Sequence, residues 1–172
     1  MKTNEERLEE ILTYLDSLSH IHSEEIPDIP LYMDQVTTFM DEHLKDVKRH
    51  QEDKVLTKTM INNYAKNNLL PPPEKKKYSK NHMLMLIFIY YFKNLLSFSD
   101  IEEIFRPITE RHFSGDDSGL KLEDIYNEVF TLEEEQMAHL KEDIRQKYEK
   151  ASRTFSTHPV GGEDLEYLRL FS

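Results

Sequence analysis

The side chains best suited to chemistry in this sequence lie on a short helix predicted over residues 57–67. Thr57 can cap its N-terminus, and four apolar residues from Met60 to Ala65 follow at the spacing of a buried helical face. The other positions are rich in asparagine and lysine. An asparagine amide can pair with adenine in the major groove of DNA, and a lysine ammonium can bind guanine or phosphate. The helix therefore predicts DNA contacts through Lys58, Thr59, Asn62, Asn63, Tyr64, Lys66 and Asn67.

A basic loop follows this helix. Three prolines at positions 71–73 end the helix, because proline lacks the N–H of the helical hydrogen bond and biases its predecessor toward extended backbone. Positive charge is concentrated here, since residues 45–80 hold ten basic and four acidic side chains in a chain of net charge −11. Lysines beside a groove-reading helix are suited to bind phosphates. The loop adds Lys75, Lys76, Lys77 and Tyr78 to the predicted DNA contacts.

Other chemistries lack their residues. With no cysteine and four glycines, the chain has no thiol nucleophile, no disulfide and little material for a glycine-rich phosphate loop. The closest pair of its eight histidines, His20 and His22, stands near a helix end, and Glu135 and His139 share a helical face without a further ligand. The turn at residues 114–119 has too few acidic ligands for calcium. We expect no enzyme activity, no metal site and no cofactor.

Helices dominate the predicted structure. Thr3 and Glu6 form a capping-box pattern, and apolar residues then recur at helical spacing, so we expect an amphipathic helix over residues 4–19. Another helix should begin after Tyr32, and the apolar stretch from Met83 to Phe92 predicts a helix at the centre of the molecule. A strand pattern appears only at residues 76–78, and the tail after residue 151 is expected to be loose up to a last apolar stretch. Further helices are expected from Ser99 to about Phe105, from Leu120 to Phe130, and from a restart at Thr131 onward.

The length of 172 residues fits one domain with a helical appendage. We divide it into an N-terminal helix with a proline-containing linker (1–30), a helix-turn-helix domain (31–106) and a C-terminal helical extension (107–172). The longest apolar run, Met83 to Phe92, has ten residues, whereas a membrane span needs about 20. The first residues lack the apolar core of a secretion signal. The sequence predicts an all-α cytoplasmic protein, a helical bundle around a helix-turn-helix with a reduced wing.

Residues 31–105 resemble the DNA-binding domain of the MerR family. Thr57 to Pro72 is similar to the family's second helix and its exit, where a Ser/Thr cap and a Leu-Arg-Tyr-Tyr core precede Gly-Leu-Leu-Pro-Pro. Lys76 to Ser79 resembles the family's Arg-Tyr-Tyr-Ser, and Phe98 to Ile104 resembles its Gly-Phe-Ser-Leu-Glu-Glu-Ile. The resemblance lies in the order of these elements and implies a winged helix-turn-helix.

Three departures from the MerR pattern concern the DNA-binding surface. The family's helix arginine, a phosphate contact, corresponds to Asn62, and its following tyrosine corresponds to Asn63. The wing also lacks the family's Gly-Tyr turn. Lys76 and Lys77 can supply the charge that the missing arginine would carry.

The whole chain also resembles a bacterial family of unknown function, domain-of-unknown-function family 1836. The similarity rests on Ile29 to Val36, on the Leu-Leu-Pro-Pro-Pro corner and on Tyr78-Ser79. It implies a MerR-like domain and no known activity.

We expect a transcriptional regulator that places the helix 57–67 in the major groove of DNA and the loop 74–78 on the flanking phosphates. One short helix reads few bases, so we expect a homodimer. The apolar stripe of the helix predicted after Thr131 would form the dimer contact, unless it packs on the chain's own core. The alternative is a protein-interaction scaffold that keeps the fold without binding DNA and takes a partner helix in an apolar groove. No effector ligand can be assigned. The predicted dimer contacts are Leu132, Met137, Leu140, Ile144 and Tyr148.

Overall fold

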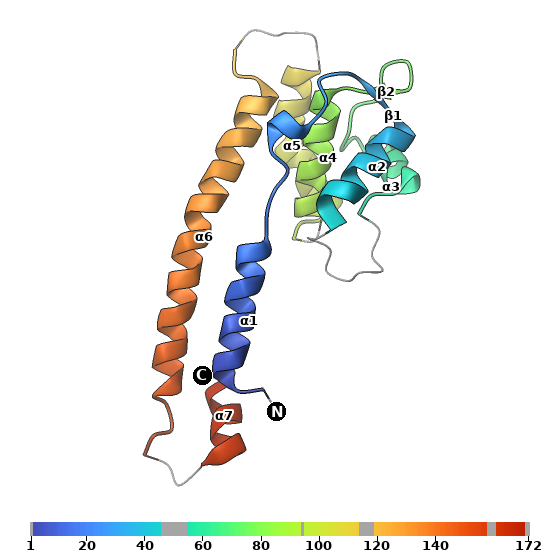
Figure 1. Cartoon of the computed structure of the whole chain (residues 1–172). Helices are drawn as coiled ribbons and strands as arrows, with labels where there is room; N and C mark the ends of the chain where they lie inside the picture. Colours follow the sequence, from blue (N-terminus) through green and yellow to red (C-terminus); the bar gives the residue numbers. More distant parts are fainter. Residues whose placement is uncertain (1, 46–54, 94, 114–118, 158–160, 171–172) are drawn as a thin grey trace. The chain divides into compact units, whose positions relative to one another are not determined.

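The computed structural model describes residues 2–45, 55–93, 95–113, 119–157 and 161–170 (Figure 1). Within these ranges the chain forms seven α-helices, a short 3-10 helix and one pair of two-residue strands, which confirms the predicted all-α class. The chain divides into two units. The larger unit holds residues 20–130, and the smaller unit holds residues 1–19 together with 131–172.

These boundaries differ from the predicted division at residues 30 and 106. The first helix groups with the last part of the chain, and the predicted linker belongs to the larger unit. An amphipathic pattern shows which side of a helix is covered, but it does not identify the element that covers it. The partners of the first helix therefore cannot be read from its own apolar pattern.

Helix α4 (Lys80–Phe92) lies at the centre of the larger unit (Figure 1). Every residue from His82 to Tyr90 is buried, as the apolar residues on all its faces predict. A buried hydrogen bond also joins the first and last parts of this unit, because the Tyr126 hydroxyl donates to the Ile21 carbonyl at 2.6 Å. Several other elements contribute side chains to the core around α4. They are the residues on either side of the 3-10 helix η1 (Ser23–Glu25), and the helices α2 (Met33–Leu44), α3 (Lys58–Lys66), α5 (Phe98–His112) and the start of α6 (Leu122–Ser152).

Two short strands tie distant segments of the larger unit together. β1 (Leu31–Tyr32) pairs antiparallel with β2 (Lys77–Tyr78), with Leu31 opposite Tyr78 and Tyr32 opposite Lys77. The strand pattern predicted at residues 76–78 is confirmed by β2, whereas β1 was not expected. Because β1 leads directly into α2 and β2 directly precedes α4, the pair fixes the basic loop beside both helices.

Helix α5 has different ends from those predicted. Its N-cap is Ser97 and not Ser99: the Ser97 hydroxyl accepts the Asp100 N–H at 3.3 Å, and the Asp100 carboxylate accepts the Ser97 N–H at 3.0 Å. The helix also continues through Pro107 to His112 instead of ending near Phe105. A proline removes one helical hydrogen bond, but the buried face of α5 keeps packing on the core, and tertiary packing supplies most helix stability.

Helix α6 is continuous over 31 residues and does not restart at Thr131. Leu122, Tyr126 and Phe130 are buried at intervals of four, and apolar residues continue at helical spacing after residue 131. A cap-like Thr-x-x-Glu pattern is a weak signal when helical spacing runs through it on both sides. Among the described helices, none combines the length and the apolar character needed to cross a membrane.

The smaller unit contains α1 (Asn4–Ser17), the part of α6 after residue 130, and α7 (Gly162–Leu170) (Figure 1). The capping box predicted for α1 is present, and α7 covers most of the last apolar stretch, up to which the tail was expected to be loose. Asn4 joins α1 to α7, since its backbone N–H and side-chain amide donate to the Glu166 carboxylate and carbonyl at 3.1 and 2.7 Å. Asp16 of α1 forms an ion pair with Lys141 of α6.

Candidate nucleic-acid interface

Both ends of α3 are fixed by hydrogen bonds. The Thr57 hydroxyl accepts the Met60 N–H at 3.2 Å, which confirms the predicted N-cap. At the other end Asn68 has left-handed backbone (φ 57°), and the Leu69 N–H donates to the Tyr64 carbonyl at 2.9 Å. This helix ending favours glycine, and asparagine is the usual substitute. The nine residues of α3 are thus held as a defined short helix.

The solvent-facing side of α3 carries amide and ammonium groups. Lys58 forms an ion pair with Asp34 of α2, and the Asn67 amide donates to the Asn63 carbonyl at 2.8 Å. Within the described part of the chain, the side-chain amides of Asn62 and Asn63 make no hydrogen bond. These two amides are therefore available to an external partner. The predicted contacts that are exposed on this side are Lys58, Thr59, Asn62, Asn63, Lys66 and Asn67.

Two predicted contacts, Tyr64 and Tyr78, are in the core. Their exposed fractions are 2% and 4%, and burial raises the pKa of each hydroxyl. The Tyr64 ring packs edge-on against Phe98, with ring centres 5.9 Å apart. A tyrosine suits a groove contact and a core position equally well in sequence, and here both lie on the buried sides of their elements. They hold the interface in place and do not form its surface.

The basic loop contains a tight two-residue turn. The Lys77 N–H donates to the Glu74 carbonyl at 2.9 Å, and the two central residues, Lys75 and Lys76, have φ angles of 49° and 65°. Such a turn favours Asn-Gly, and left-handed backbone costs other residues about 1–2 kcal/mol each. Both lysines are exposed. The turn therefore holds two ammonium groups at its tip at a cost in stability.

The other lysines near this turn are already engaged. The Lys77 ammonium lies 5.0 Å from the centre of the Tyr32 ring, a cation–π contact across the strand pair. Lys80 bonds to Asp28 at 3.0 Å and to Glu123 at 2.8 Å. Burial disfavours its charged form, but these two carboxylates outweigh burial and raise the pKa of Lys80. Lys80 thus serves the fold, while Lys75 and Lys76 are at the surface.

His82 lies at the base of the turn and was not singled out by the sequence. The Ser79 N–H donates to its Nδ1 at 3.1 Å, which leaves the proton of the neutral ring on Nε2. Burial lowers the pKa of His82, and the nearby carbonyls of Pro72 and Pro71 oppose that shift without forming a hydrogen bond to Nε2. The signal available in sequence was its position three residues after the Ser79 cap. The ring borders a pocket of about 560 Å³ whose lining includes Lys75, Lys77, Pro30 and Phe113.

The segment that builds this surface is almost free of acidic residues. Residues 54–99 contain eight lysines and only one of the 33 acidic residues of the chain, Glu74. The scarcity of acidic residues can be read from the sequence, but a count over residues 45–80 hides it because that range includes three further acidic residues. In the structure it means that α3 and the turn present cations and amides with few acidic side chains of their own.

The predicted dimer stripe has two environments within the smaller unit. Leu132 and Leu140 are 56% and 43% exposed. Ile144 and Tyr148 are half-buried and line a pocket with residues of α1 and α7. The stripe is therefore covered by its own chain near its end and open to solvent near its start. Met137, between these parts, is half-buried beside Leu140.

No group of three or more histidine, aspartate or glutamate residues in the described ranges could hold a metal ion. Most of the turn considered for calcium, residues 114–118, lies outside the described residues. Residues 46–54 also lie outside the described residues. In the sequence, the apolar face of the helix expected after Tyr32 extends to Val47, and a polar stretch follows at 48–54.

Comparison with protein families shows which family this chain resembles. The family described as Domain of unknown function (DUF1836) matches residues 21–129, which span nearly all of the larger unit, including β1, α3, the tight turn and α4. Neither the curated proteins nor the solved structures include a significant match to this chain. Since the matched region covers more than half of the 172 residues, the protein belongs to the DUF1836 family.

Proposed function

We propose that this protein is a sequence-specific DNA-binding transcriptional regulator of the cytoplasm. α3 would enter the major groove, and the loop from Glu74 to Tyr78 would lie on the flanking phosphates. The observation that carries this proposal is the combination of free amides on α3 with exposed lysines on the tight turn, in a segment that holds one acidic residue. Amides at base edges provide specificity, and lysines at phosphates provide affinity.

The order of elements supports the same proposal. The similarity of the sequence to MerR proteins implies a winged helix-turn-helix, and the β1–β2 pair is consistent with a reduced wing attached to the start of α2. The connection from α2 to α3, residues 45–57, is longer than the three or four residues of a simple helix-turn-helix. We therefore propose a helix-turn-helix with an enlarged turn.

A homodimer is part of the proposal, because a nine-residue helix reads only a few base pairs. Leu132 and Leu140 are the exposed apolar residues of α6 that a second copy would cover. Ile144 and Tyr148 are partly covered already, so the proposed contact centres on the first part of the stripe.

The test begins with selection of bound sequences from random duplexes at about 50 mM salt. Affinity for the selected duplex and for a scrambled one is then measured by fluorescence anisotropy. Asn62→Ala should weaken binding to the selected duplex by about 1–3 kcal/mol and leave the scrambled one unchanged, if Asn62 makes a bidentate pair with adenine. Lys75→Asn with Lys76→Gly suits the turn geometry, and it should weaken binding to both duplexes and flatten the salt slope by about 0.9 per lost phosphate contact.

A charge-matched control removes two exposed cations of the smaller unit, by Arg145→Gln with Arg153→Gln. This variant should bind both duplexes as the wild type does. If no sequence is enriched, or if the turn variant and the control behave alike, DNA binding is excluded and the scaffold alternative is preferred. The turn variant also guards against a folding artefact, since Asn-Gly should stabilise the turn.

A further inference from the structure

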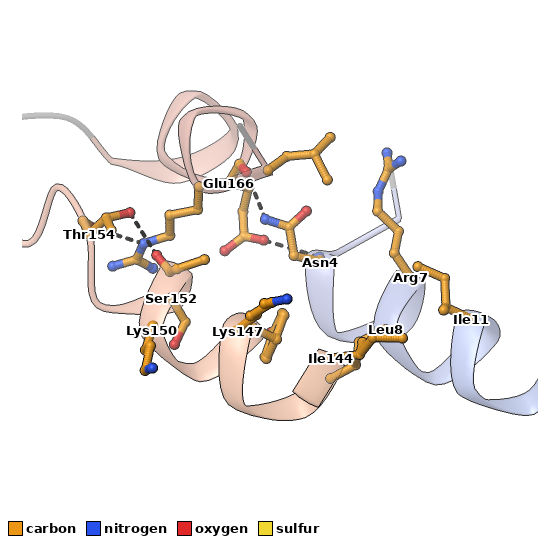
Figure 2. Close-up of a pocket in the computed structure, with 14 residues that line it drawn as sticks. Asn4, Arg7, Leu8, Ile11, Ile144, Lys147, Lys150, Ser152, Thr154 and Glu166 are labelled. Atoms are coloured by element: carbon orange, nitrogen blue, oxygen red, sulfur yellow. Dashed lines mark hydrogen bonds between the residues drawn. The ribbon is translucent and has the colours of Figure 1, made fainter. Parts of the chain in front are cut away.

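The smaller unit contains a pocket of about 660 Å³ between α1, the end of α6 and α7 (Figure 2). Its floor is apolar: Leu8 of α1 and Ile144 of α6 lie side by side, and Ile11 continues the apolar strip along α1. The volume falls within the usual range of small-molecule sites, about 300–1,000 Å³. No single helix forms it, and residues from both ends of the chain are required.

The rim of this pocket is strongly biased toward positive charge. The smaller unit has eight basic and fourteen acidic residues. Half of the basic residues line the pocket, but only one acidic residue, Glu166, does so. An unbiased surface of this unit would be mainly acidic. The basic lining residues are Arg7, Lys147, Lys150 and Arg169.

The one carboxylate in the lining is occupied by the fold. The Glu166 side chain accepts the N–H of Asn4 at the start of α1, so it caps that helix. Arg169 donates from Nε to the Thr154 carbonyl at 3.2 Å, and Lys147 pairs with Asp143 at 2.6 Å on an exposed part of α6. The buried Nε of Arg7 has no hydrogen bond in the described structure. Apart from Lys147, the pocket lining therefore has three cations, Arg7, Lys150 and Arg169, and one carboxylate.

We propose that this pocket binds a small amphipathic anion, a molecule with an apolar body and a carboxylate head. The body would lie on the strip formed by Leu8, Ile11 and Ile144, and the head would face Arg7, whose buried Nε has no partner in the described structure. Buried cation donors without a partner are costly, and a carboxylate is the group that satisfies them best. A cationic head would leave Arg7 unsatisfied, and a neutral acceptor would bind it more weakly than a carboxylate does, which gives the site its preference for anions.

Tyr148 adds a polar group to the same pocket. Burial and the negative charges of Glu5 and Glu166 raise the pKa of its hydroxyl, against the effect of Arg169. The hydroxyl therefore stays protonated and can donate to an anionic head. The site is distinct from the proposed DNA surface, which lies entirely in the larger unit, so either proposal can fail alone.

Isothermal titration calorimetry on the full chain tests this proposal with decanoate, hexanoate and decyltrimethylammonium, each below its micelle concentration. We expect decanoate to bind with one site per chain and at least about tenfold more tightly than hexanoate, because four methylenes are added to the buried body. Decyltrimethylammonium, with a similar tail and opposite charge, should bind at least about tenfold more weakly than decanoate.

Variants locate the site. Arg7→Gln should weaken decanoate binding at least about tenfold, whereas the charge-matched Arg145→Gln should leave decanoate binding unchanged, since Arg145 does not line the pocket. Helix content by circular dichroism must match the wild type for both variants. Three results would each overturn the proposal. They are equal affinities for decanoate and decyltrimethylammonium, an equal loss of decanoate affinity in the two variants, and binding to anionic lipid vesicles without binding to monomeric decanoate.

Discussion

In the larger unit α4 is buried on every side, whereas in the smaller unit α1 has one buried residue, Leu12, and α6 keeps Leu132 and Leu140 exposed. All three helices follow helical spacing of apolar residues. The difference lies in the number of neighbours. α4 shares its hydrophobic core with side chains from four other helices of its unit, while the described part of the smaller unit has three helical pieces. With few neighbouring helices, the smaller unit leaves apolar surface uncovered. Both the proposed ligand pocket and the proposed dimer contact lie in this unit.

The contrast is most directly tested by matched truncations. Leu86→Ala in α4 removes a fully buried side chain and should lower the free energy of unfolding by about 2–5 kcal/mol. Leu8→Ala in α1 removes a half-buried side chain and should cost about 1 kcal/mol or less. Urea unfolding followed by circular dichroism measures both. Losses of equal size would mean that the smaller unit is as tightly packed as the larger one.

The next effect concerns the exposed stripe. Leu140→Glu places a charge on the proposed dimer contact and should weaken dimerisation by about 2 kcal/mol or more, with unchanged helix content because Leu140 is 43% exposed. Sedimentation velocity at micromolar concentration measures the change. Ala138→Glu, on another face of α6, is the control and should remain dimeric. A wild-type protein that sediments as a monomer would refute the proposed dimer.

Local signals predicted most of the helices. Thr3 with Glu6, and Thr57, are side chains whose capping bonds form as expected. The continuous apolar run of α4 predicted its complete burial. These features succeed because cap, spacing and burial are set by residues close in sequence.

The failures share a different cause. Pro107 lies inside α5, and α6 passes through Thr131, because packing along the whole helix outweighs a local stop signal. The grouping of α1 with α7 depends on contacts such as Asn4 with Glu166, which are 162 residues apart. For the candidate site, the exposed amides and lysines were predicted, but the left-handed turn and the role of His82 depend on backbone geometry that spacing does not reveal.

The smallest expected effect is a pH dependence that belongs to the larger unit. Burial holds the pKa of His82 below its ordinary value of 6.5 in the folded state. The unfolded chain therefore binds the proton at a higher pH than the folded chain does, and stability rises with pH across that interval. The contribution of the neutral ring is complete above about pH 6.5 and is lost as the pH falls from there through the lower folded value. Protonation of His82 would also put a hydrogen on Nδ1, so that Nδ1 could no longer accept the Ser79 N–H.

His82→Gln removes this titration, so its free energy of unfolding should change less with pH below about 6.5 than that of the wild type. Urea unfolding of both proteins at closely spaced pH values gives the difference directly. The two proteins have the same carboxylates, so the carboxylate contribution to the pH dependence cancels in this difference. His139→Gln, an exposed histidine of the smaller unit, should retain the slope of the wild type. If His82→Gln retains that slope too, or if His139→Gln flattens it equally, the buried ring does not carry the pH dependence. The loss of slope should follow His82, because its charged form is the one that the packed core disfavours.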